Sequence, residues 1–183
     1  MKTDELPIIL RIVGGKTEEF AYFLNAYGQQ VFTLIARMVG SEEDAQELTQ
    51  DTFLKAYQHL DSFNGGSSFS TWIYRIAYNT ALSALRKKPS EVLAFDDKMW
   101  ASLSDTEIDD SLDSEEEATI ERLHHAIGQL SPEEQAIITL FYEEDKSISE
   151  LAVILKQSEN NIKVKLHRLR KKLYVIMKEE ERR

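Results

Sequence analysis

The stretch "SISELAVILKQSENNIKVKLHRLRKKL", Ser147 to Leu173, carries the strongest structural signal in this chain of 183 residues. Two amphipathic segments flank the short turn "KQS". The first segment begins with Ser147 and Glu150, which have the spacing of a capping box, and its apolar residues recur at helical intervals. The second segment carries one apolar stripe, made of Ile162, Leu166, Leu169, Leu173 and Ile176. Two helices joined by so short a turn predict a helix-turn-helix.

The second of these helices is basic, although the whole chain has a formal net charge of −10. From Lys156 to Lys172 there are seven Lys or Arg residues and one acid, Glu159. In a helix-turn-helix the second helix enters the major groove with its N-terminal residues toward the base edges. Glu159, Asn160, Asn161 and Lys163 are placed to read bases, whereas Lys165, Arg168 and Lys172 farther along hold phosphates. The pattern favours DNA binding; the alternative is a basic helix that is merely solvated.

The rest of the chain also has helical patterns, and Gly (7) and Pro (3) are scarce. "SPEE" at Ser131 starts another capped helix. Residues 17–88 predict three helices, preceded by a shorter one that ends at Gly14 and Gly15. The first of the three carries a stripe of Phe20, Phe23, Leu24, Tyr27, Val31, Ile35 and Met38. We therefore predict an all-α fold.

Charge divides this fold into parts. Residues 90–121 hold one Lys and twelve Asp or Glu, and such a block of like charge repels itself and favours an extended linker. We predict two small helical domains, residues 1–89 and 118–183, joined by an acidic linker at residues 90–117. An acidic linker can also fold back on the basic helix. We hypothesise that neutralising Asp105 to Glu117 raises the DNA affinity of the isolated protein.

Several classes of protein are disfavoured. The chain has no Cys, so it has no disulfide framework and no thiolate metal site. "MKTDELPIIL" lacks the basic and apolar regions of a signal peptide, and no run approaches the roughly 18 apolar residues of a membrane span. No P-loop, metal-ligand spacing or Ser/His/acid arrangement is present. We expect a cytoplasmic protein that does not insert into membranes, is not an enzyme, and needs no cofactor or metal.

The loop "DSFNGGSSFS", Asp61 to Ser70, precedes an unusual set of side chains. Its small residues and two glycines leave room for a ligand near the backbone. After it come Trp72, Tyr74, Arg75, Tyr78 and Asn79, which cannot all face one core. Aromatic rings beside Arg and Asn are typical of a platform for unstacked bases. Each aromatic residue taken alone is more simply a core residue.

These motifs together resemble a known family. "DAQELTQDTFLKAYQHLDSF" (44–63) and "FSTWIYRIAYNTALSALRKK" (69–88) resemble conserved region two of bacterial sigma factors. "LSPEEQAIITLFY" (130–142) with the Ser147–Leu173 stretch resembles region four. The order and separation, with no room for region three, are those of the extracytoplasmic-function class. "FYEEDKS" (141–147) departs from the stretch that usually precedes region four, "FNGGSS" is smaller than many family loops, and Val164 stands where a small polar residue is common.

The resemblance implies a promoter-specificity subunit that recruits core RNA polymerase through the β′ clamp helices and the β flap and binds promoter DNA. It implies polymerase contacts at Asp44, Glu47, Leu48, Gln50, Asp51 and Phe53. It implies contacts to the −10 element at Phe63, Asn64, Gly65, Trp72, Arg75, Tyr78 and Asn79. It implies contacts to the −35 element at Ser158, Glu159, Asn160, Asn161, Lys163, Lys165, Arg168 and Lys172. An anti-sigma factor is a further expected partner.

Two other functions remain open at this point. A helix-turn-helix repressor or activator would act without core polymerase, dimerise through its N-terminal domain and bind a palindrome. An interaction module would bind polymerase without contacting DNA.

Overall fold

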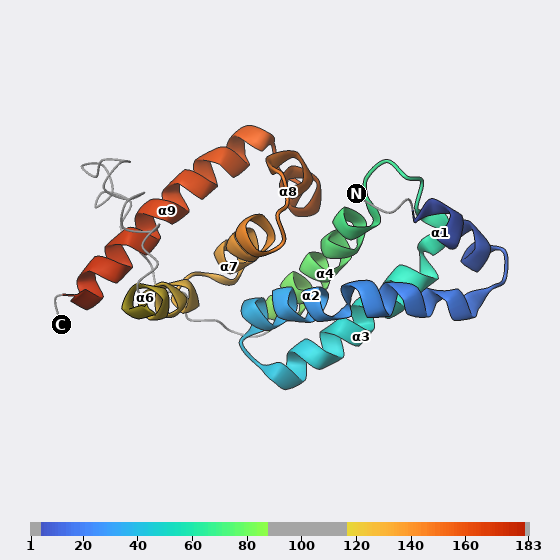
Figure 1. Ribbon diagram of the computed structural model, residues 1–183, viewed down its shortest axis with the longest axis horizontal. Coiled ribbons are helices and arrows are strands. Elements are labelled where there is room, and N and C mark those ends of the chain that lie inside the picture. The colour runs from blue at the N-terminus through green and yellow to red at the C-terminus, as the bar shows by residue number, and fades with distance from the viewer. Residues whose placement is uncertain (1–4, 88–116, 182–183) are drawn as a thin grey trace.

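The computed structural model describes residues 5–87 and 117–181, and within these ranges every regular element is a helix. Figure 1 shows the helices gathered in two bundles, α1 to α4 in one and α6 to α9 in the other. This agrees with the predicted all-α fold of two small domains. The predicted acidic linker, residues 90–117, lies outside the described residues except for Glu117, where α6 begins. The hypothesis about Asp105 to Glu117 therefore rests on residues outside the described ranges, apart from Glu117.

The first bundle follows the predicted order of a short helix and then three longer ones. Its elements are α1 (Leu6–Val13), the 3-10 turn η1 (Thr17–Phe20), α2 (Ala21–Val39), α3 (Glu42–Gln58), the 3-10 turn η2 (Leu60–Ser62) and α4 (Phe69–Leu85). Gly40 ends α2 in the left-handed conformation, with a φ of 68°. The hydroxyls of Ser41 and Ser68 then cap α3 and α4 by accepting from backbone N–H groups of the first turn.

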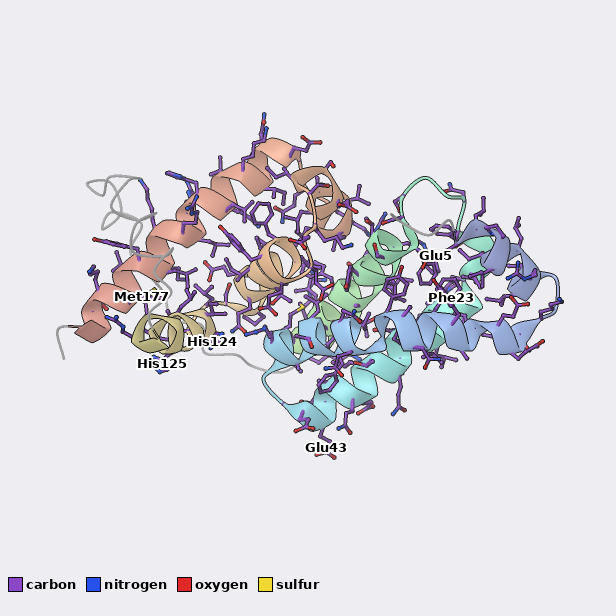
Figure 2. The ribbon with its side chains drawn as sticks, in the orientation of Figure 1. Glu5, Phe23, Glu43, His124, His125 and Met177 are labelled. Atoms are coloured by element: carbon purple, nitrogen blue, oxygen red, sulfur yellow. The ribbon has the colours of Figure 1, made fainter. Side chains whose placement is uncertain are left out.

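The core of this bundle lies between α2, α3 and α4, which pack against one another. Phe23 of α2 (labelled in Figure 2) is fully buried. Its ring stacks on that of Phe69 in α4, with ring centroids 3.9 Å apart. One predicted member of the α2 stripe is wrong, because Leu24 is 46% exposed. A helix turns by about 100° per residue, so Leu24 points away from the side that Phe23 buries.

The second bundle contains the predicted helix-turn-helix. Its elements are α6 (Glu117–Gly128), α7 (Pro132–Ile138), the π-helical turn η4 (Thr139–Glu143), α8 (Ile148–Leu155) and α9 (Glu159–Glu181). Ser131 and Ser147 begin α7 and α8 with complete capping boxes, as predicted. Ser158 caps α9 by accepting from the Asn161 N–H at 3.2 Å. All five residues of the predicted α9 stripe are buried.

The turn between α8 and α9 is made without glycine. Lys156 ends α8 in the left-handed conformation, with φ of 54° and ψ of 47°. A residue with a Cβ adopts this conformation at a cost of roughly 1–2 kcal/mol. The lysine backbone therefore does what glycine often does at the end of a helix.

The two bundles pack against each other, α8 on α4 and α7 on α2 (Figure 1). Charged and polar groups cross this boundary. The contacts are Thr71 Oγ1 to Glu150 Oε1 at 3.0 Å, Lys146 Nζ to Ser70 Oγ at 2.8 Å, Arg37 to Glu143 at 2.9 Å, and the Tyr74 hydroxyl to Glu144. The sequence patterns gave no sign of this boundary.

Candidate nucleic-acid interface

Helix α4 presents two different faces. Ser70, Thr71, Tyr74 and Tyr78 are buried, and the first three contact the second bundle. On another side, Trp72, Arg75, Ile76, Asn79, Thr80 and Ser83 line a cleft. The two faces follow from the helical repeat, since residues three or four apart share a side. Of the three aromatic residues in the predicted cluster, Tyr74 and Tyr78 are core residues, and Trp72, which packs against the core, is the one that lines the cleft.

The cleft lies between α3 and α4 and has a volume of about 430 Å³. Arg75 at its wall is exposed, and Trp72 and Asn79 are half-buried. Lys55 of α3 and His59, the residue that follows this helix, also line the cleft, and Lys55 Nζ donates to Thr80 Oγ1 at 3.2 Å. None of the nine lining residues is acidic. The cleft therefore combines an indole ring with two cationic side chains, a combination suited to an anionic strand.

Lys55 and His59 were not among the predicted site residues. Their spacing of four places both on one side of α3, immediately before the glycine loop. The spacing of four is visible in the sequence. It indicates a binding site only once α4 is known to lie beside α3.

The indole of Trp72 is held in place by two phenylalanine rings. Its ring centroid lies 5.5 Å from that of Phe63 and 5.5 Å from that of Phe69. Phe63, which was predicted to contact the −10 element, is half-buried by this packing. Edge-on and tilted aromatic contacts fix ring orientation. The Trp72 ring therefore lines the cleft in a fixed orientation.

The glycine loop makes a tight turn between Phe63 and α4. Gly65 has a φ of 73°, a conformation that strongly favours glycine. The Asn64 side-chain oxygen accepts from the Gly66 N–H at 3.0 Å. A Cβ at position 66 would lie 3.1 Å from this oxygen, so the turn is shaped for a small residue there. Asn64 and both glycines are exposed.

Tyr78 was predicted to contact the −10 element, and the contact between the two bundles buries it in this arrangement. Its side chain is 4% exposed and lies on the buried face of α4. Burial, and secondarily the nearby carboxylate of Glu133 in α7, raise the pKa of Tyr78 to about 12. Tyr78 therefore lies within the contact between the bundles and is covered while they are packed together.

Helix α3 carries the predicted polymerase-binding residues on an exposed side. Glu47, Gln50 and Asp51 are exposed, and Asp44 and Leu48 are half-buried. Figure 2 shows the neighbouring Glu43 at the start of α3, pointing away from the protein. Leu54 is 55% and Tyr57 is 40% exposed, and both follow the same helical stripe as Glu47 and Gln50 although they were not predicted.

Phe53 is the member of that predicted set that is wrong. Its side chain is 4% exposed and packs edge-on against Phe20 with ring centroids 6.5 Å apart. In the sequence, Phe53 stands next to residues of the exposed stripe. Residues 53 and 54 nevertheless point to different sides of α3, which explains the error.

The N-terminal half of α9 presents the predicted −35 residues to solvent. Glu159, Asn160, Asn161, Lys163 and Arg168 are exposed, as is Ser158 before the helix. Lys165 is half-buried, and its ammonium group is 4.0 Å from the Glu133 carboxylate. The Asn161 amide donates to Gln157 Oε1 at 3.2 Å. Val164, 48% exposed, adds an apolar side chain to this surface.

Lys172 was predicted to hold a phosphate, and this prediction is also wrong. Its side chain is buried, and its Nζ lies 2.7 Å from Glu134 Oε2. The same Glu134 oxygen accepts from the Ser131 N–H at 2.8 Å in the capping box of α7. Lys172 therefore joins α9 to α7 inside the second bundle.

A second cavity, of about 310 Å³, opens within the second bundle between α6, α7, η4 and α9. Apolar side chains form most of its wall, with one acid and one arginine at the edge. The lining residues are Leu123, His124, Ile127, Ile138, Tyr142, Glu143, Arg170 and Leu173. Such a cavity suits an apolar side chain of a binding partner.

Among residues 5–87 and 117–181, no helix is long and apolar enough to cross a membrane. In the same part of the chain, no three His, Asp or Glu side chains are grouped so that they could hold a metal ion.

Comparison with known proteins gives consistent results for both bundles. The family model "Sigma-70 region 2" matches residues 23–90, and the model "Sigma-70, region 4" matches residues 120–173. The RNA polymerase sigma-H factor of Pseudomonas aeruginosa is 32% identical over 173 residues, which cover 89% of this chain and 88% of the relative. The ECF RNA polymerase sigma factor SigW of Bacillus subtilis is 29% identical over 177 residues, covering 90% and 92%.

Among solved structures, the fold is similar to that of the sigma factor RpoE from Bartonella quintana, solved in complex with the anti-sigma factor NepR. The TM-score is 0.64, with 22% identity and coverage of 88% of this chain and 98% of the other. This likeness extends over both bundles.

Proposed function

The chain belongs to the extracytoplasmic-function class of the sigma-70 family, and on that basis we propose which of its surfaces contact promoter DNA and core RNA polymerase. As a sigma factor it directs RNA polymerase to promoters and is not an enzyme. We assign residues 1–89 to region 2 and residues 118–183 to region 4, which the matched ranges 23–90 and 120–173 support.

The −35 element is proposed to bind the N-terminal half of α9. Glu159, Asn160 and Asn161 are exposed at the end that enters the major groove of a duplex. Glu can accept from cytosine N4, and Asn can pair with adenine N6 and N7. Lys163 lies at the same end and is also placed toward the bases, whereas Lys165 and Arg168 lie farther along and would contact phosphates, which orient the helix without specifying sequence. Lys172 is removed from this set by its ion pair with Glu134.

The −10 element is proposed to enter, as an unpaired strand, the cleft between α3 and α4. Trp72 supplies a surface for base stacking, worth about 1–3 kcal/mol per base. Asn79 lines the cleft, where its side chain would contact a base edge. Lys55, His59 and Arg75 line the same cleft and would attract the phosphates of the strand. The exposed Asn64 and Gly65 at the adjoining loop are proposed to contact a flipped base, which costs a few kcal/mol to unstack.

Core polymerase is proposed to bind two surfaces, one in each region. The first is the exposed stripe of α3, where acidic and amide side chains alternate with Leu54 and Tyr57. This composition suits a basic, partly apolar helix such as those of the β′ clamp. The second is the apolar cavity of region 4, which is proposed to receive the β flap.

An anti-sigma factor is a further proposed partner. The support is the solved sigma factor RpoE of Bartonella quintana, whose structure is a complex with the anti-sigma factor NepR. A partner that covers the exposed stripe of α3 or the region 4 cavity would compete with polymerase for the same side chains.

The observation that carries this proposal is the exposed reading end of α9, Glu159 to Lys163, presented by a capped helix-turn-helix. The test is run-off transcription by core polymerase and the purified chain over a promoter library. Lys163→Ala is expected to reduce transcription several-fold, and the control His167→Ala, exposed on the same helix, is expected to leave it unchanged. The proposal fails if the chain binds DNA as a dimer and adds no activity to core polymerase.

A further inference from the structure

Four consecutive residues, from the last residue of η4 to the residue before the cap of α8, include three charged side chains that contact region 2. We call Glu143, Glu144, Asp145 and Lys146 the latch segment. It falls inside "FYEEDKS", which departs from the stretch that usually precedes region four, and its first residue, Glu143, also lines the cavity of region 4.

Lys146 is the most deeply placed residue of the latch segment. Only 9% of its surface is exposed, and its Nζ donates to Ser70 Oγ of α4 at 2.8 Å. The same ammonium group lies 5.1 Å from the centre of the Tyr74 ring. A buried charge is tolerated only where such partners replace water, so the position of Lys146 depends on region 2 being in contact.

Glu144 and Glu143 make the other two contacts. The Glu144 carboxylate accepts a hydrogen bond from the hydroxyl of Tyr74, a side chain that is 1% exposed. Burial raises the pKa of Tyr74 far above its ordinary value, and the bond to Glu144 raises it further, so the hydroxyl stays protonated and donates. Glu143 pairs with Arg37 of α2 at 2.9 Å.

The backbone around the latch segment is in unusual conformations. The turn η4, whose last residue is Glu143, is π-helical, and Asp145 has a φ of 49° in the left-handed region. The Lys146 N–H donates to the Leu140 carbonyl at 2.9 Å, which closes this turn. Costly conformations persist where surrounding contacts impose them. Here they direct Glu144 and Lys146 to the same side of the chain, toward α4.

The docked arrangement restricts the helix-turn-helix. In complexes of this motif, the first helix crosses the DNA backbone while the second reads the groove. In this chain the first helix, α8, packs along α4, and Glu150 of its first turn accepts from Thr71. A duplex on α9 would therefore approach a side of α8 that region 2 covers.

From these contacts we propose that the latch segment holds regions 2 and 4 closed in the free chain and that it releases when core polymerase binds. Closure by the latch follows from the geometry alone, whereas the releasing partner rests on the proposed function. Polymerase opens the latch only if it binds the separated regions more tightly than the docked ones. The latch thus makes holoenzyme formation depend on a population of open molecules.

The test measures distance within the full chain and needs no transcription. The sequence contains no cysteine, so Glu43→Cys in α3 and His124→Cys in α6, both exposed, carry a pair of spin labels. Pulsed electron paramagnetic resonance is expected to give one narrow distance distribution for the otherwise unchanged chain. Lys146→Met is expected to broaden the distribution and shift it to longer distances.

A matched control comes from the second buried lysine. Lys172 has the same exposed fraction, 9%, but pairs within region 4, so Lys172→Met is expected to keep the narrow distribution. Tyr74→Phe removes only a hydroxyl and is expected to broaden the distribution as Lys146→Met does. If both latch variants keep the narrow distribution, or if the parent chain is already broad, closure by the latch is refuted.

The second measurement is the association rate of unlabelled chains with core polymerase. If closed molecules must open first, Lys146→Met is expected to associate about threefold faster or more. Longer distances in Lys146→Met without a change in this rate would refute release by polymerase while leaving closure intact. A chain that shows the latch but does not bind polymerase would instead contradict the proposed function.

Discussion

The ammonium group of Lys172 in α9 lies 2.7 Å from the Glu134 carboxylate in α7, and the same carboxylate oxygen accepts from the backbone N–H of Ser131. One glutamate thus completes a helix cap and neutralises a lysine that is 9% exposed. The pair fixes α9 against the helix that precedes the helix-turn-helix. It also distinguishes Lys172 from Lys163 and Arg168, whose side chains are exposed on the same helix.

We expect Glu134→Ala to destabilise region 4 by about 2 kcal/mol, because it removes a cap and leaves a buried lysine without this partner. Chemical denaturation followed by circular dichroism measures the change. The control is Glu133→Ala, one residue earlier, whose exposed carboxylate is 4.0 Å from Lys165; we expect less than about 0.5 kcal/mol there. Equal effects of the two substitutions would contradict the assigned role of Glu134.

Phosphate contacts of α9 are measurable through salt dependence. We expect Arg168→Ala to reduce the slope of log K against log salt by about 0.9 for holoenzyme on a duplex containing the −35 element. The exposed neighbour His167 provides the control, since His167→Ala is expected to leave the slope unchanged. An unchanged slope in Arg168→Ala would remove this arginine from the phosphate contacts.

A separate prediction concerns promoter melting and the cleft between α3 and α4. We expect Lys55→Met or His59→Ala to shorten the half-life of the open complex about fivefold, equivalent to roughly 1 kcal/mol. Permanganate reactivity of unpaired thymines reports the melted strand. Gln58→Ala alters an exposed residue of the same helix outside the cleft and should have no effect. If all three substitutions behave alike, the cleft does not hold the strand.

Alkaline pH tests the buried position of Tyr78. The pKa of Tyr78 is raised to about 12 from an ordinary value of 10.0, mainly by burial, so the folded chain favours the protonated phenol. The stability contributed by this preference is fully present below pH 10 and is lost as the pH rises toward 12. We expect Tyr78→Phe to flatten the decline in unfolding free energy over this window, measured by denaturation at each pH. The exposed ring of Tyr57 gives the comparison, and an equally flattened curve for Tyr57→Phe would argue against the assignment.

The left-handed residue between α8 and α9 offers a stabilising substitution. Lys156→Gly is expected to raise the stability of region 4 by about 0.5–1 kcal/mol, because glycine adopts a φ of 54° without the Cβ penalty. Lys156→Ala retains a Cβ and is expected to match the parent chain. A thermal melt of the three proteins distinguishes relief of backbone strain from loss of the lysine charge.

Local patterns in the amino-acid order were enough to locate the helices and their buried stripes. Ser131 with Glu134 and Ser147 with Glu150 form capping boxes as predicted, and the stripe from Ile162 to Ile176 is buried. These features depend on residues three or four apart, which the helical repeat brings together whatever the rest of the chain does. The all-α fold and the helix-turn-helix followed from them, and the family resemblance supplied the candidate surfaces.

The roles of Tyr78, Lys172 and Lys146 depended on contacts between residues far apart in the chain. Tyr78 lies on the side of α4 that region 4 covers, Lys172 meets a carboxylate 38 positions earlier, and Lys146 reaches a serine 76 positions earlier. Periodicity says which side of a helix is apolar or charged, but not which helix comes to lie against it. A lysine that binds phosphate and a lysine that binds a neighbouring helix therefore read alike until the packing is known, because burial and electrostatic pairing are set by three-dimensional neighbours.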